Sequence, residues 1–213
     1  MFKYMWIAGL LVCGTTAQAG VITFDNWSGN LSADYTVVID DNTAGLFTFQ
    51  VTVDAGFDAN VLALAINSGG TYNTAGDLGL TMIDPATLEA GFPALFFDTL
   101  SCAQGCNFNG VISGVFDVII KFQGPGGSGG AIESLQFSIA QLGGMTLGSF
   151  SQLGIRAQDT GAGGCAETEE CDSDKALSGP PTTPPVEVAE PGTLALLGAG
   201  LIGLALTRRR KIA

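Results

Sequence analysis

Four cysteines have the spacing that most directly predicts chemistry in this sequence: Cys102, Cys106, Cys165 and Cys171. In an exported chain, an even number of cysteines predicts disulfides. The short separations favour pairing Cys102 with Cys106 and Cys165 with Cys171, although spacing alone leaves three pairings open. Four thiolates can also hold zinc, but neither pair has the two-residue spacing usual for zinc ligands. We therefore expect two disulfides, and no metal or other cofactor.

Histidine is absent from all 213 residues, which excludes histidine-based triads, histidine general bases and histidine-ligated zinc. Glycoside hydrolysis needs two carboxylates, but the sequence sets no distance between any two of its acids. The run Ser173-Asp174-Lys175 contains a serine and a lysine, as a nucleophilic site would. It lies among polar residues that would not desolvate the lysine, so we expect it on the surface. The sequence predicts a protein that is not an enzyme.

Two loops gather the side-chain oxygens that calcium prefers. Their residues are Asp40, Asp41, Asn42, Asp54, Asp58 and Asn60. Neither loop has the spacing of an EF-hand, and Asp and Asn are common in turns, so solvated turns are expected instead. Trp27, Tyr35 and Tyr72 could stack on sugar rings, but packing in the core is their expected use.

The elements that must position these residues are β-strands. Polar and apolar residues alternate through Leu46–Val53, which places Phe47, Phe49, Val51 and Val53 on one face. Eight further segments resemble strands: Val21–Phe24, Tyr35–Ile39, Val61–Ile66, Leu78–Ile83, Ala94–Phe97, Val115–Phe122, Ile132–Ile139 and Phe150–Ala157. Nine short strands, with 31 glycines to supply turns, predict an all-β ectodomain, a β-sandwich of the jelly-roll kind. One helical turn is expected at Pro85–Ala90.

Changes in composition divide the chain. The predicted sandwich covers residues 20–159, and the glycine-rich stretch Gly124–Gly130 is expected to be an exposed loop within it. From Thr160 the chain is rich in Gly, Glu and Asp, and four prolines lie in Gly179–Pro185. Residues 160–188 therefore resemble an extended tether that follows the sandwich.

The first 19 residues have the order of a secretory signal peptide. Lys3 precedes an apolar run at Tyr4–Val12, and the small residues of Ala17-Gln18-Ala19 mark a cleavage site before Gly20. Cys13 raises lipidation as an alternative, but Val12 stands where a lipoprotein peptidase requires a small residue. We expect residues 1–19 to direct export and then to be removed.

The other end resembles a single membrane helix. Residues 193–207 carry no charge, and a basic tail follows, made of Arg208, Arg209, Arg210 and Lys211. Fifteen residues span roughly 22 Å, less than the roughly 30 Å core of a bilayer, although flanking arginines can extend towards the interface. By the positive-inside rule the tail stays in the cytoplasm, which agrees with a signal peptide that exports the preceding chain.

Residues 189–213 together resemble the PEP-CTERM sorting signal of Gram-negative bacteria. Glu190 and Pro191 match its motif, Ala189 occupies the place of the first proline, and the short helix and basic tail follow in order. The resemblance implies that exosortase, a membrane protease, recognises Ala189-Glu190-Pro191. It also implies transient anchoring in the inner membrane, followed by transfer or release to the cell surface or the exopolysaccharide matrix.

Between residues 20 and 188 the chain has 19 acidic residues and three basic ones, Lys121, Arg156 and Lys175, a difference of −16. Such a charge repels nucleic acid and anionic lipid headgroups, so no nucleic-acid partner is expected. We expect an exported protein with a structural or adhesive role in the surface matrix. A carbohydrate-binding module for the exopolysaccharide is the alternative, and a secreted hydrolase is a remote one.

Overall fold

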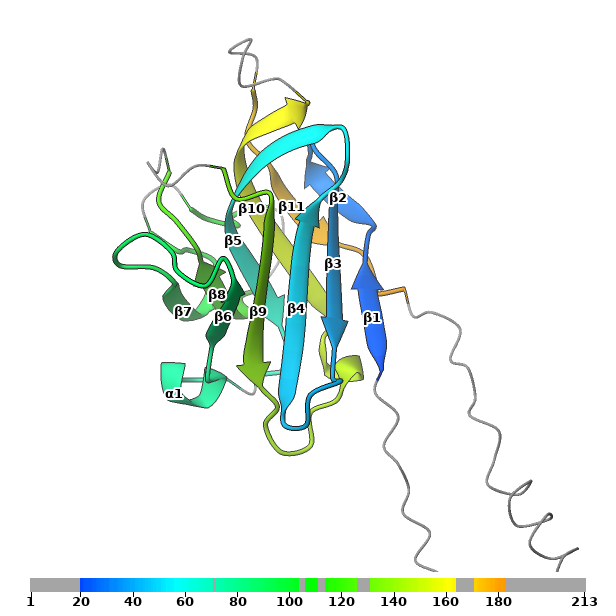
Figure 1. The fold of residues 1–213 in the computed structure, drawn as a ribbon, viewed down its shortest axis with the longest axis vertical. Coiled ribbons are helices and arrows are strands. Elements are labelled where there is room, and N and C mark those ends of the chain that lie inside the picture. The colour runs from blue at the N-terminus through cyan, green and yellow to red at the C-terminus, as the bar shows by residue number, and fades with distance from the viewer. Residues whose placement is uncertain are drawn as a thin grey trace, which may run out of the picture. The chain divides into compact units, whose positions relative to one another are not determined.

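The computed structural model describes residues 20–70, 72–103, 106–110, 114–125, 131–163 and 171–182. Their strands form two sheets in which every pairing is antiparallel (Figure 1). The five-stranded sheet has the order β1 (Val21–Phe24), β3 (Tyr35–Asp40), β4 (Leu46–Val53), β9 (Ser134–Ala140) and β6 (Thr81–Asp84). The six-stranded sheet has the order β2 (Trp27–Asn30), β11 (Lys175–Ser178), β10 (Gln152–Ala162), β5 (Phe57–Asn67), β8 (Phe116–Lys121) and β7 (Ala94–Thr99).

The two sheets share one hydrophobic core. Strand β4 alternates as predicted, with Phe47, Phe49, Val51 and Val53 buried. Phe49 stacks on Phe137 of β9, with ring centroids 4.9 Å apart. Phe137 in turn meets Phe122, which directly follows β8 of the other sheet, at 5.6 Å. Aromatic contacts of this kind add to the apolar burial that holds two sheets together.

A second, smaller cluster covers the outer face of the six-stranded sheet. The segment between β7 and β8 places the Cys102–Cys106 disulfide and Phe108 there, against β5, β8 and β10. Gly154 of β10 makes this contact possible, because a Cβ atom at that position would lie 2.8 Å from Phe116 and 2.9 Å from Phe108. Strand β5 is consequently covered on both faces, unlike the half-exposed strands that alternation predicts.

All nine predicted strands overlap observed ones, but two observed strands, β2 and β11, were not predicted. Leu78 belongs to the short helix α1 (Ala75–Leu78), so the strand predicted from Leu78 begins only at Thr81. The turn expected at Pro85–Ala90 is not helical, and the other short helix is a 3-10 turn at Leu147–Ser149. Part of the predicted loop Gly124–Gly130 lies outside the described residues.

The predicted boundary between sandwich and tether is wrong. Strand β10 continues to Ala162, and β11 lies between β10 and β2 in the six-stranded sheet. Beyond β11, the backbones of Thr182 and Thr23 exchange hydrogen bonds of 2.7 and 2.9 Å. The folded domain therefore extends to Thr182. The sequence pattern does not reveal this, because β11 has only four residues, too few for a recognisable period, and is held by distant partners.

Two truncations test this boundary. We expect a fragment of residues 20–182 to fold, with a circular dichroism spectrum dominated by β-structure. A fragment of residues 20–158 lacks β11 and leaves the edge of β10 unpaired, so we expect it to aggregate or to lose its cooperative thermal transition. Equal melting of the two fragments would contradict the extended boundary.

Among the described residues, no helix has the length and hydrophobicity needed to cross a bilayer. The predicted helix at residues 193–207, the basic tail and the signal peptide lie outside the described residues.

Candidate functional site

The three basic residues between positions 20 and 188 lie in one row across the six-stranded sheet. They are Lys121, Arg156 and Lys175. Asn30 of β2 pairs with Lys175 of β11, and Lys175 pairs with Arg156 of β10. Arg156 pairs with Ala63 of β5, which pairs with Lys121 of β8. Residues in one row of an antiparallel sheet project from the same face. Pairing therefore gathers on one face cations that are far apart in the sequence.

Two of these cations hold the covering segment that contains the disulfide. The ammonium of Lys175 donates to Asn107 Oδ1 at 2.9 Å and to the carbonyl of Asn109 at 3.0 Å. Lys121 donates to the carbonyl of Ala103 at 3.1 Å, and its side chain is buried. Burial lowers the pKa of Lys121 below its ordinary value. Neutral backbone and amide oxygens accept all three bonds.

Arg156 has neutral acceptors as well. Its Nη1 donates to the carbonyls of Ala157 at 2.6 Å and Asp174 at 2.7 Å, and its Nη2 lies 3.4 Å from Ser173 Oγ. Its Nε is buried without a hydrogen-bond partner among the described residues. Burial lowers the pKa of the guanidinium, and the negative charge of Asp174 opposes this shift. Arginine nevertheless stays charged, because its ordinary pKa lies far above neutral pH.

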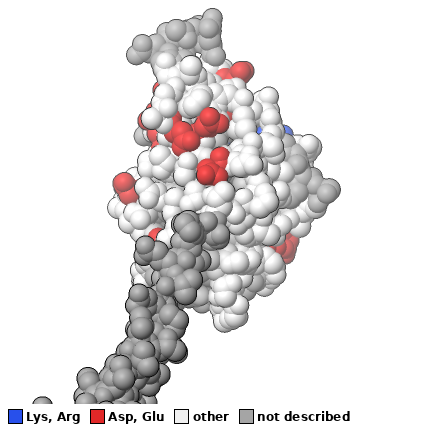
Figure 2. All heavy atoms as spheres, turned by 90° about the vertical axis from the view of Figure 1, so that its right-hand side faces the viewer, with Lys and Arg blue, Asp and Glu red and all other residues white. Residues whose placement is uncertain are grey.

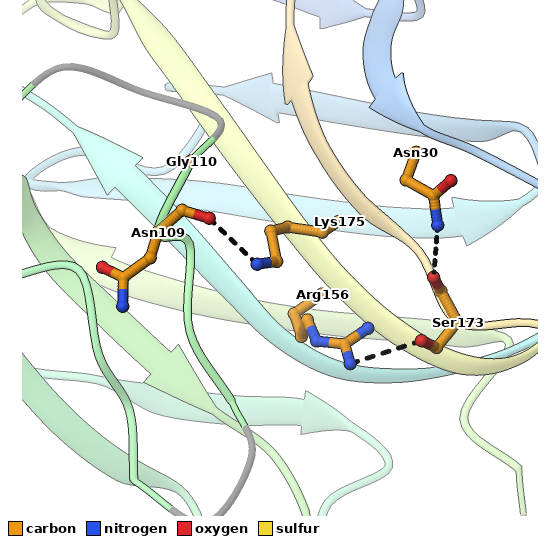
Figure 3. Close-up of a pocket in the computed structure, with 6 residues that line it drawn as sticks. All are labelled: Asn30, Asn109, Gly110, Arg156, Ser173 and Lys175. Atoms are coloured by element: carbon orange, nitrogen blue, oxygen red, sulfur yellow. Dashed lines mark hydrogen bonds between the residues drawn. The ribbon is translucent and has the colours of Figure 1, made fainter.

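These side chains line an open pocket of about 420 Å³. Its walls are Asn30, Asn109, Gly110, Arg156, Ser173 and Lys175. Figure 3 shows Lys175 extending towards Asn109 and the guanidinium of Arg156 lying beside Ser173, with Asn30 across the pocket. The lining combines two cations with amide and hydroxyl groups that can donate or accept hydrogen bonds. Such a surface can bind a polar, anionic small molecule.

Asp174, expected on the surface as part of the run Ser173-Asp174-Lys175, is fully buried. Its carboxylate accepts four hydrogen bonds, on the side of the chain away from the pocket. The donors are the Ser32 and Ala33 backbone N–H groups at 2.8 and 3.0 Å, the Tyr35 hydroxyl at 2.6 Å and the Thr160 hydroxyl at 2.9 Å. The surface prediction for this residue was wrong, because its donors come from two other segments, residues 32–35 and Thr160 of β10.

The aromatic candidates for sugar stacking are mainly structural, as predicted. Tyr35 and Tyr72 are fully buried, and Tyr72 donates to the carbonyl of Ala140. Half-buried Trp27 packs edge-on against Tyr35 at 6.2 Å and donates to its carbonyl at 2.6 Å. Burial, followed by the hydrogen bond to Asp174, raises the pKa of Tyr35, and burial alone raises the pKa of Tyr72.

The raised pKa of Tyr72 predicts a loss of stability at alkaline pH. Above about pH 10 the unfolded chain ionises this tyrosine while the folded chain keeps its proton, so the free energy of unfolding falls as pH rises. We expect Tyr72→Phe to reduce the slope by about 1.4 kcal/mol per pH unit above that pH. Urea unfolding from about pH 9 to about pH 11 measures both slopes. Parallel curves for the two proteins would contradict the assignment.

The loop residues considered for calcium have other contacts. Asp40 Oδ1 accepts from the backbone of Asn42 at 3.0 Å, and Asp41 Oδ1 accepts from the backbone of Gly20 at 2.5 Å. Asp54 accepts from the Thr36 hydroxyl at 2.9 Å. Asn60 is buried and accepts from Gln123 and, at 3.0 Å, from the backbone of Ile132. No group of three or more acidic or cysteine side chains placed to hold a metal occurs in the described segments.

The cysteine prediction is confirmed for one pair. Cys102 and Cys106 form a disulfide. Cys171 is also disulfide-bonded, and Cys165, its predicted partner, lies outside the described residues. The sorting residues Ala189, Glu190 and Pro191 and the basic tail at Arg208, Arg209, Arg210 and Lys211 lie outside them as well.

The charged side chains visible on the face on the side of β1 are mainly acidic. Figure 2 shows them gathered over its upper part, with basic atoms visible only near its margin. The pocket cations therefore differ in sign from most of the charged side chains visible on this face. Sequence reasoning did not identify Arg156 and Lys175 as neighbours, although the scarcity of cations was a signal that could have drawn attention to both.

Comparison with known proteins identifies one family. The model described as the PEP-CTERM protein-sorting motif matches residues 187–211. No curated protein matches the chain, and no solved structure does. The match confirms the resemblance drawn from Glu190, Pro191 and the basic tail.

Proposed function

We propose that this chain, which carries a PEP-CTERM protein-sorting motif, has a structural or adhesive role in the matrix at the cell surface. The motif supports export of the chain and its sorting by exosortase. The working part of the chain is the folded domain, a β-sandwich built from the two sheets. The observation that carries this proposal is the position of the sorting motif. Only residues 183–186 separate the matched motif from the last paired residue of the domain, Thr182.

The chain preceding the motif has features of a durable extracellular domain. A disulfide closes the segment that covers the six-stranded sheet, in keeping with an oxidising compartment. The backbone nitrogen of Gly20, the first residue after the predicted cleavage site, lies 2.5 Å from Asp41 Oδ1. Cleavage there would create an ammonium group at an existing carboxylate. This contact supports a mature chain that begins at Gly20.

The buried carboxylates support a role without catalysis. Asp117 accepts from Ser68 N at 2.6 Å, Ser68 Oγ at 3.2 Å and Gly70 N at 2.8 Å, and so holds the turn after β5. Asp174 holds the approach to β3 in the same manner. A glycoside hydrolase of the usual kind needs two carboxylates on either side of the bond to be cleaved. Asp117 and Asp174 instead bind separate loops.

Cell fractionation tests the proposed role. We expect the mature protein outside the inner membrane, sensitive to protease added to intact cells, with all four cysteines resistant to alkylation before reduction. Cells without the protein should retain less matrix and attach less firmly to a surface. The complete gene should restore both properties, whereas a version lacking residues 20–182 should not. Unchanged attachment and matrix retention would contradict the role, even if the protein is correctly sorted.

Carbohydrate binding is the second candidate function, and the pocket at Arg156 and Lys175 favours it. Polar pockets use a few well-placed hydrogen-bonding groups to orient a ligand. The amide groups of Asn30 and Asn109 and the hydroxyl of Ser173 lie around the two cations.

A further inference from the structure

We propose that the pocket at Arg156 and Lys175 binds an acidic sugar, with the carboxylate on the two cations and the hydroxyls on the surrounding amide and hydroxyl groups. This site belongs to the folded domain and does not depend on how the chain is sorted. It deepens the second candidate function by naming the class of saccharide.

Positive charge is scarce in this part of the chain and is concentrated at the pocket. From residue 20 to residue 188 only three of 22 charged side chains are basic, and two of these three line one pocket. Every hydrogen bond that Arg156 and Lys175 make among the described residues goes to a neutral oxygen or a hydroxyl. Asp174 does not neutralise them by contact, because its carboxylate accepts four bonds from other residues. The positive charge at the pocket therefore remains available to a ligand.

The two cations of the pocket have more N–H donors than their hydrogen bonds within the described residues use. The lysine ammonium has three N–H groups and the guanidinium five. Lys175 uses two of its three, and Arg156 uses both at Nη1 and one at Nη2. Counted over the described residues, one N–H of Lys175 and one at Nη2 remain for the two oxygens of a carboxylate, while the buried Nε adds charge without direct access. Charge-assisted bonds of this kind are the stronger class of hydrogen bond.

The polar groups around the two cations suit the hydroxyls of a sugar ring. Asn30, Asn109 and Ser173 are exposed. Lys175 binds the backbone carbonyl of Asn109, and the side-chain amide of Asn109 takes no part in the hydrogen bonds among the residues that line the pocket. Amides and hydroxyls both donate and accept, as the hydroxyls of a sugar ring require. The Asn30 amide already donates to the Ser173 carbonyl at 3.1 Å and the Ser173 hydroxyl accepts from Arg156, but both groups keep capacity for further hydrogen bonds that a simple anion would not use. The long-range repulsion from the acidic surface is screened beyond roughly 8 Å at physiological ionic strength, so the local cations dominate within the pocket.

Calorimetry on the full chain, purified from the cell envelope in detergent, tests the proposal with trigalacturonate as the probe. We expect trigalacturonate to bind, and its methyl ester, which keeps the rings but lacks the charges, to bind at least about 10-fold more weakly. Acetate should also bind more weakly than the trisaccharide. Equal binding of the ester or of acetate would overturn the proposal, and so would the absence of trigalacturonate binding.

Variants place the binding in the pocket. Arg156→Gln and Lys175→Gln should each weaken binding about 10- to 100-fold. Because both side chains also hold the fold, Asn109→Asp supplies a variant that keeps those contacts and adds a negative charge at the rim. We expect it to weaken binding at least about 10-fold, whereas Asn42→Asp, the same change in the β3–β4 turn, should have no effect.

The outcomes separate this proposal from the matrix role. Unaltered binding in all three pocket variants would overturn the site. Self-association that Lys175→Gln abolishes, without any binding of trigalacturonate, would instead identify an acidic surface of a second copy as the ligand and would also overturn it. A failure of attachment or matrix retention in the cell assay bears only on the structural or adhesive role, since calorimetry measures the pocket directly.

Discussion

Replacing Asp174 with alanine should lower the free energy of unfolding of the domain by about 3–5 kcal/mol. The change leaves two backbone N–H groups and two hydroxyls without their acceptor in a site from which water is excluded. It also removes the charge that favours the protonated form of Arg156. Domains of this size are commonly stable by only about 5–15 kcal/mol, so the loss is a large share of the total.

Urea unfolding of the fragment 20–182 measures this effect, with Asp172→Ala as the matched control. Asp172 lies two residues away and is exposed, and its carboxylate accepts one 3.3 Å bond from Ser32 Oγ. We expect the control to cost less than about 1 kcal/mol. Asp174→Asn, which keeps the shape and one acceptor oxygen, should fall between them. Similar losses for Asp172→Ala and Asp174→Ala would show that the buried carboxylate does not organise the domain.

Substituting Glu190 and Pro191 with alanine should block processing by exosortase. The motif match spans both residues, and the chain should then remain in the inner membrane with its C-terminal segment attached. An epitope placed after Ala213 would detect this form as a slightly larger band. Pro185→Ala, a proline substitution just before the matched residues, serves as the control and should be processed normally. Residues 193–213 on the mature surface protein would contradict a transient anchor.

Neutral substitutions in the basic tail should act at an earlier step. Arg208, Arg209, Arg210 and Lys211 oppose passage of the tail across the membrane. Without them we expect the chain to slip through the inner membrane, so that unprocessed protein with its epitope is found beyond that membrane. Two different defects, retention in one case and escape in the other, would separate recognition of the motif from anchoring of the helix.

Local patterns in the sequence predicted much of the fold. Alternation in Leu46–Val53 gave the bounds of β4 and its buried face, because side chains of a strand point in turn to the two sides. The close spacing of Cys102 and Cys106 predicted their disulfide, since few residues separate the two thiols. The order of Glu190, Pro191 and the basic tail identified the sorting signal, which depends on sequence rather than on a folded surface.

Only the tertiary structure decided where the domain ends and what its polar residues do. Asp174 and Tyr35 form a hydrogen bond across 139 positions of sequence, and no local pattern encodes such a contact. Strand β11 has four residues, too few for a recognisable period, and is held by β10 and β2. The same pairing aligns Asn30, Lys175 and Arg156 in one row. Short-range order is set by neighbouring side chains, whereas the pocket depends on strand register, which is determined only when distant segments pair.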